Sequence, residues 1–214
     1  MLSGDRVEWP NTPRSSWSRF IISLMLRNPE FVSQHGARVA AYFSPTSPEI
    51  NERYLKYRTA DDPETYEEFL AKNEHPAARV SARSLQAQID HPEVGTHLNK
   101  MRWSLATFTD MRHSFLTSDR PIIMSNGLMK KHDHLVIPIT PSKLFVATNN
   151  EETSALIRNM GELELIRQIN HRVAVQARRF VYGIDDSQLR FVENRLGKME
   201  PLTPLEYPKL TAPS

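Results

Sequence analysis

The first hundred residues carry apolar side chains at the spacing of amphipathic helices. After Pro13, apolar residues recur at i, i+3, i+4, i+7 and i+8, as Trp17, Phe20, Ile21, Leu24 and Met25. This spacing places them on one face of a helix. The same kind of pattern predicts a helix from 77 to 89, which "PEVGTHLNKM" extends after a break at Pro92.

Four dipeptides mark the expected starts of helices: Thr12-Pro13, Asn28-Pro29, Ser47-Pro48 and Asp62-Pro63. In each, the polar side chain can accept a hydrogen bond from a free N–H group of the first helical turn. Proline fits the next position because the N–H group that it lacks would have no helical partner there. The sequence therefore predicts four helices beginning at these prolines.

Near Lys100 the pattern changes to short runs rich in β-branched and aromatic residues, which is typical of strands. The runs are "MRWSLATF", "SFLTS", "PIIMS", "HLVIPIT" and "KLFVATN". Polar or proline-containing turns separate them, so we expect an antiparallel meander. After Asn150 the helical spacing returns and predicts a long helix over 156–180 with a bend near Gly161, followed by a strand over 189–194.

This order of elements predicts an α+β fold, with N-terminal helices, a central antiparallel sheet and a long C-terminal helix packed on the sheet. We expect a single domain over residues 1–196. Residues 197–214 hold four prolines and are expected to form an extended or disordered tail.

The composition excludes cysteine chemistry and argues against a membrane-spanning protein. The 214 residues include no cysteine, which excludes disulfides, thiolate nucleophiles and cysteine metal sites. No apolar run approaches the ~20 residues that a membrane helix needs, and the first residues lack the apolar core of a signal peptide. We therefore expect no membrane association and a cytoplasmic location.

Neither the net charge nor the histidines and glycines point to a particular ligand. The net charge is only +2, whereas a nucleic-acid-binding protein more often has a dense basic face. His132 and His134 alternate along a predicted strand and could face one ion, but two ligands are too few and two lysines precede them. Seven glycines do not supply a phosphate-binding loop. We expect no metal and no cofactor.

The stretch "HSFLTSDRPIIMSN" holds the candidate chemistry, and two interpretations stay open. Ser118 and Asp119 are typical of a polar turn, because both side chains bond local backbone and Asp favours the start of a type I turn. A serine nucleophile would instead need a base and a group that orients it. The G-x-S-x-G turn that presents a hydrolase serine is missing around Ser118.

Several motifs together resemble a bacterial family known as domain of unknown function 4238. The matching stretches are "MRWSLATF" with Trp103, "TSDRP" at 117–121, "PITP" at 138–141, and the helix segment with Asn170, Ala177 and "RFVY" at 179–182. Family members usually begin with a segment like H-Y-[VI]-P ahead of the first helix, which is missing here. We expect either a start further upstream or a shortened member.

The resemblance implies no particular reaction, so three functions from different classes are kept. The first is a binding or regulatory module, because no complete catalytic set is present. The second is a hydrolase with a polar site near the T-S-D-x-P turn, and the third is nucleic-acid binding by the more basic second half. The candidate site residues are Ser118, Asp119, Asn170, Arg179 and Trp103.

Overall fold

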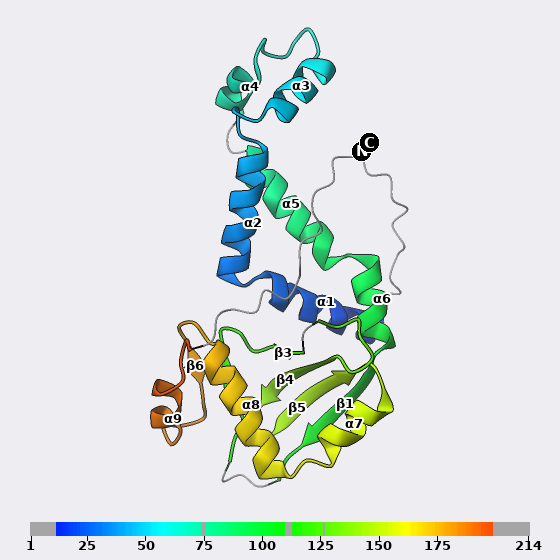
Figure 1. Cartoon of the computed structure of the whole chain (residues 1–214), viewed down its shortest axis with the longest axis vertical. Coiled ribbons are helices and arrows are strands. Elements are labelled where there is room, and N and C mark those ends of the chain that lie inside the picture. The colour runs from blue at the N-terminus through cyan, green and yellow to red at the C-terminus, as the bar shows by residue number, and fades with distance from the viewer. Residues whose placement is uncertain (1–11, 74–75, 110–112, 126, 199–214) are drawn as a thin grey trace. The chain divides into compact units, whose positions relative to one another are not determined.

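The computed structural model describes residues 12–73, 76–109, 113–125 and 127–198. The chain divides into two compact units. Met1–Ser18 and Glu93–Ser214 form the first, here called the sheet unit, and Arg19–Pro92 form the second, the helical unit. Helices come first, an antiparallel sheet follows, and a long helix near the C-terminus packs on it, which confirms the predicted α+β class (Figure 1).

The helical unit contains most of the N-terminal helices. They are α1 (Pro13–Leu26, of which residues 19–26 lie in this unit), α2 (Pro29–Tyr42), α3 (Pro48–Tyr57), α4 (Tyr66–Lys72) and α5 (Pro76–Ile89). Helices α2 and α5 lie side by side, and α3 and α4 follow the end of α2 (Figure 1). Between α3 and α4 the rings of Tyr54, Tyr66 and Phe69 pack together, with centroid distances of 5.3 to 6.2 Å.

Three of the four predicted helix starts are confirmed, since α1, α2 and α3 begin at Pro13, Pro29 and Pro48. The fourth is wrong. Asp62 turns back, and its carboxylate accepts hydrogen bonds from the N–H and the hydroxyl of Thr59 at 2.7 and 2.8 Å. Helix α4 starts later, where Thr65 and Glu68 form a reciprocal capping box.

The sheet unit is built on four antiparallel strands in the order β1-β5-β4-β3. Their bounds are β1 (Arg102–Thr107), β3 (Ile123–Met124), β4 (His134–Thr140) and β5 (Lys143–Thr148). Strands β3, β4 and β5 form the expected meander, and β1 pairs with β5 over its whole length. The remaining predicted strand, β2 (Thr117–Ser118), leaves this sheet and pairs with β6 (Val181–Tyr182).

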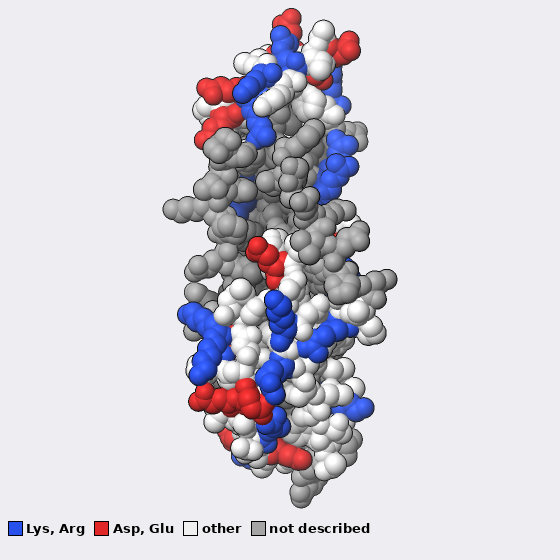
Figure 2. Space-filling view, turned by 90° about the vertical axis from the view of Figure 1, so that its right-hand side faces the viewer, with Lys and Arg blue, Asp and Glu red and all other residues white. Residues whose placement is uncertain are grey.

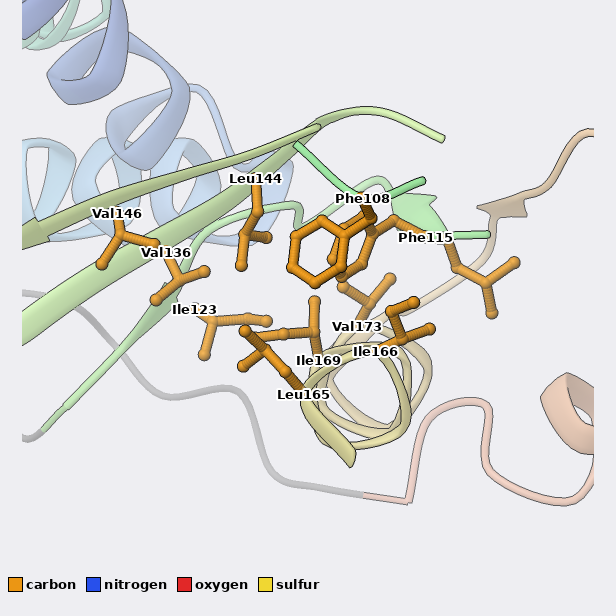
Figure 3. Close-up of a cluster of buried hydrophobic side chains, with 11 residues drawn as sticks. Phe108, Phe115, Ile123, Val136, Leu144, Val146, Leu165, Ile166, Ile169 and Val173 are labelled. Atoms are coloured by element: carbon orange, nitrogen blue, oxygen red, sulfur yellow. The ribbon is translucent and has the colours of Figure 1, made fainter. Parts of the chain in front are cut away.

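One face of the sheet is covered by α8 (Glu162–Gln176). Figure 3 shows side chains from the strands and from α8 pointing toward one another. The cluster is formed by Phe108, Phe115, Leu116, Ile123, Val136, Leu144, Val146, Leu165, Ile166, Ile169 and Val173, all of them buried. Burial of apolar area at roughly 25 cal/mol per Å² makes such a cluster the main stabilising contribution of this unit.

The opposite face of the sheet contacts the first turns of α1. Successive strand residues point to opposite faces, so Phe145 points away from the neighbouring Leu144 and Val146. Its ring meets those of Trp17 and Trp103 edge to face, at 5.5 and 5.3 Å. The sheet is therefore packed on both faces within its own unit.

The C-terminal part differs from the prediction in two places. The expected long helix is divided into α7 (Glu151–Arg158) and α8 at Gly161, which is the N-cap of α8. Residues 189–194 were expected to form a strand, but Leu189–Glu193 form the short helix α9. A short apolar run does not distinguish a helix from a strand, and here the partly buried Phe191 and Val192 pack against the core cluster from a helical turn. Nearly all of the predicted tail, residues 199–214, lies outside the described part.

Candidate functional site

The Thr117–Pro121 turn is bound to the end of α8. The Asp119 carboxylate accepts hydrogen bonds from the backbone N–H groups of Arg178 and Arg179, at 3.0 and 2.8 Å. The Asp119 N–H donates to the carbonyl of Phe180 at 3.1 Å. Ser118 Oγ accepts a hydrogen bond from the Arg120 N–H, also at 3.1 Å. We call this set of contacts the clasp, because it holds β2 and its turn against the start of β6.

Asn170, within α8, performs a similar role for the residues just before β2. It is only 2% exposed, and its Oδ1 accepts from the Leu116 N–H at 2.9 Å. Its Nδ2 donates to the Ser114 carbonyl at 2.8 Å and to Gln188 Oε1 at 2.9 Å. Both hydrogens of the amide and its oxygen are therefore engaged by neighbouring protein groups.

Arg179 and Trp103 complete the predicted set and lie on different elements. The Arg179 side chain is exposed, and its backbone N–H belongs to the clasp. Trp103 lies on β1, where Nε1 donates to the Leu98 carbonyl at 3.0 Å. The Arg14 guanidinium stacks over the Trp103 ring at 3.8 Å and donates to the carbonyls of Asn99 and Met101.

The structure thus brings together some of the sequence-predicted residues and separates others. Ser118, Asp119 and Arg179 meet in the clasp through backbone groups. Asn170 bonds the same strand segment a few residues earlier, and Trp103 belongs to a different packing cluster. These contacts favour the interpretation of T-S-D-x-P as a structural turn, because its polar side chains serve the backbone.

A cleft of about 530 Å³ opens beside this region, between α8 and α9. Its floor includes Leu163, Ile166 and Phe191, and its polar lining includes two arginines and two histidines, which are Arg167, Arg195, His113 and His171. Gln168, Asn170, Ser187 and Gln188 complete the described lining, which contains no carboxylate. The cleft is therefore cationic on an apolar floor.

The cationic side of the cleft is partly preorganised. Arg195 Nε donates to His171 Nδ1 at 3.1 Å, and its Nη1 donates to the Phe191 carbonyl at the same distance. The guanidinium also stacks on the Phe191 ring at 3.9 Å. Since Nδ1 of His171 accepts this bond, the proton of the neutral ring lies on Nε2, which is left to donate to a ligand.

Arg167 belongs to the same helix face as His171, because residues four apart are neighbours on a helix. Its side chain is exposed and forms no ion pair within the described part of the chain. The spacing of Arg167 and His171 is visible in the sequence and could have indicated this cleft. Arg195 gave no such signal, because it follows a segment whose helical state was not expected.

The face with α7 carries mixed charge. Arg102 and Arg158 both pair with Glu151, and Lys131 pairs with Glu152 at 3.5 Å. In Figure 2, Lys and Arg side chains in the lower half of this face alternate with Asp and Glu side chains. Such a surface differs from the continuous basic face that a nucleic-acid backbone requires.

Within the described residues, no three His, Asp or Glu side chains are grouped so that they could hold a metal ion. His132 and His134, which alternate along the chain, use Nδ1 toward Thr153 Oγ1 and the His132 carbonyl, at 3.4 and 3.3 Å. In the same part of the chain, no helix is both long enough and apolar enough to cross a bilayer.

Comparison with known proteins gives one match. No curated protein and no solved structure matches the chain. One family model matches residues 1–187, which include the clasp, Trp103 and all of α8. The chain therefore belongs to the family described as protein of unknown function (DUF4238).

Proposed function

We propose that this protein is a binding module whose sheet unit holds a small anionic ligand in the cleft between α8 and α9. The observation that carries this proposal is the lining of the cleft, in which two arginines and two histidines face a space without a carboxylate among the described residues. A cleft lined by one sign of charge concentrates ligands of the opposite sign.

The chemistry of the groups fits an anion such as a phosphate or a carboxylate. A guanidinium presents planar N–H donors to such oxygens and remains charged at physiological pH. Arg167 is the most available donor, and His171 Nε2 lies on the same helix face. Leu163, Ile166 and Phe191 add an apolar floor, which suits an organic anion better than a bare ion.

The alternatives have less support. A hydrolase at the T-S-D-x-P turn would need a free nucleophile or base, whereas the carboxylate of Asp119 and the amide of Asn170 are engaged by backbone and side-chain groups. Nucleic-acid binding would need a continuous basic face, whereas Arg102, Arg158 and Lys131 pair with glutamates. A bacterial source and a cytoplasmic location stay predictions from the sequence.

The test is titration calorimetry of the full chain with inorganic phosphate and, separately, with phenyl phosphate. Both probes are expected to bind, and phenyl phosphate is expected to bind more tightly than inorganic phosphate because of the apolar floor. Arg167→Ala should weaken binding at least about tenfold, since a lost charged hydrogen bond is equivalent to roughly 1.5–3 kcal/mol. Added salt should weaken binding as well.

Arg172→Ala is the matched control, because Arg172 is an exposed arginine on the same helix that does not line the cleft. Its affinity for both probes should stay at the wild-type value. Equal losses in the two variants would show a general charge effect and overturn the assigned site. Absence of binding by every probe would overturn the proposal itself.

A further inference from the structure

The segment "RRFVYGIDD", Arg178 to Asp186, combines exposed apolar residues with charges of opposite sign at its two ends. It begins with two arginines, continues with exposed apolar residues in alternate positions, and ends with two aspartates. Phe180, Tyr182 and Ile184 are each 55% exposed. The rings of Phe180 and Tyr182 stack on each other, with centroids 6.2 Å apart and planes 23° from parallel.

The backbone of β6 has one partner strand and one open edge. It pairs with β2 through the registers Thr117↔Tyr182 and Ser118↔Val181. Because the Phe180 carbonyl accepts from Asp119, the hydrogen-bonding groups of Phe180 and Tyr182 face β2. The N–H and C=O of Val181 therefore point away from β2, and no described strand other than β2 pairs with β6.

We propose that β6 pairs antiparallel with β6 of a second copy of this chain, with Val181 opposite its own counterpart on the two-fold axis. An isologous contact of this kind requires a surface that is complementary to itself. In this register Phe180 lies opposite Tyr182 of the second copy, so the two stacked pairs of rings form one cluster of four. Two open strand edges are thereby closed at once.

Charge complementarity selects a second copy as the occupant. In an antiparallel arrangement, the basic end of one segment lies near the acidic end of the other. Arg179 at the basic end of one copy then approaches Asp186 at the acidic end of the other, and the long arginine side chain bridges the remaining distance. The contact is small by the standard of permanent dimers, so the association is reversible and depends on concentration.

The experiment is sedimentation velocity on the full chain over a wide range of protein concentration, in low salt. The wild type is expected to shift from monomer to dimer as its concentration rises. Arg179→Glu and Asp186→Lys change exposed side chains without a hydrogen bond to another described side chain. Each variant alone should stay monomeric at concentrations where the wild type is dimeric, because like charges then face each other.

The decisive sample is an equimolar mixture of the two variants, in which one end of the contact keeps the wild-type charges and the two reversed charges, opposite in sign, meet at the other end. This mixture is expected to recover the dimer, and circular dichroism of each variant controls for folding. Phe180→Ser should abolish association without charge reversal. A mixture that stays monomeric overturns the proposal, as does a dimer that Phe180→Ser leaves intact. A wild type that is monomeric throughout overturns it too, and it would point to a strand of another protein at this edge.

Discussion

At the scale of single residues, several polar side chains form hydrogen bonds with backbone groups that no helix or sheet pairs. Asn170 satisfies the N–H of Leu116 and the carbonyl of Ser114 from inside the protein. Asp119 satisfies two N–H groups beyond the end of α8. The bonds of Asn170 are buried, so its removal would leave buried backbone groups without partners.

Asn170→Ala is therefore expected to lower the free energy of unfolding by about 3 kcal/mol, since several buried groups lose their partner at once. Urea denaturation followed by circular dichroism measures this change. Gln168→Ala is the control on the same helix. Gln168 is exposed and bonds only Glu164 among the described residues, so its loss should stay within about 0.5 kcal/mol. Similar values for both variants would contradict the role assigned to Asn170.

His35 gives a pH dependence at the same scale. It is 7% exposed between α2 and α5, its Nε2 lies 2.6 Å from Ser84 Oγ, and its ring stacks on Phe31. Burial lowers the pKa of His35 below its ordinary value, and the nearby Arg38 charge acts in the same direction, against a backbone hydrogen bond at Ser81. The folded state therefore favours the neutral ring.

Because the pKa of His35 is lower in the folded state, the unfolded chain binds the proton first as pH falls. The contribution of His35 is fully present above the unfolded pKa, near 6.5, and is lost as pH decreases below it. Unfolding of the wild type and of His35→Gln should be compared between about pH 8 and pH 5. The wild type should lose more stability on acidification. Parallel pH profiles would count against the burial of this ring.

At the scale of elements, the sequence predicted where helices begin better than it predicted which side chains contact each other. Asn28-Pro29 gave a correct helix start because capping and proline geometry are local effects, and Ser47-Pro48 gave one through proline geometry, since the Ser47 side chain makes no capping hydrogen bond. Asp62-Pro63 is the same kind of dipeptide, but the Asp62 carboxylate accepts hydrogen bonds from Thr59 instead of capping a helix. An aspartate can accept from the helix that follows it or from the residues that precede it. The local path of the backbone decides between them, and a dipeptide does not determine that path.

The strands show the same limit. Short runs of β-branched and aromatic residues located β4 and β5, whose buried residues are consecutive. They could not place β2 with β6, because that pairing joins positions 60 and more apart and depends on how α8 ends. The cleft was not predicted for a related reason. Arg195 lines it because residues 189–193 form a helix, and the sequence predicted a strand there.

Capping provides an element-scale prediction within the helical unit. Thr65 forms a full capping box with Glu68, whereas the Ser47 side chain makes no capping hydrogen bond. Thr65→Ala is expected to lower the free energy of unfolding by about 1 kcal/mol, and Ser47→Ala by only a few tenths. Thermal or urea unfolding of both variants measures the difference. An equal effect would mean that the box does not stabilise α4.

At the scale of the whole molecule, the chain combines two compact units. One boundary between them lies within α1, between Ser18 and Arg19, and the other lies between Pro92 and Glu93. The single domain over residues 1–196 stays a prediction. It requires that heat unfold both units in one cooperative transition, with equal calorimetric and van't Hoff enthalpies. Calorimetry of the full chain tests this, and two resolved transitions would indicate two domains.

The clasp also has a consequence for the order of folding. Asp119 and its partners on Arg178 and Arg179 are 59 and 60 positions apart, and the loop between them contains β4, β5 and α8. Closing so long a loop has an entropic cost that favours formation of the enclosed elements first. Asp119→Ala should therefore accelerate unfolding and leave the refolding rate nearly unchanged in stopped-flow measurements. On this view, the turn that is most recognisable in the sequence is the last part of the sheet unit to fold and the first to open.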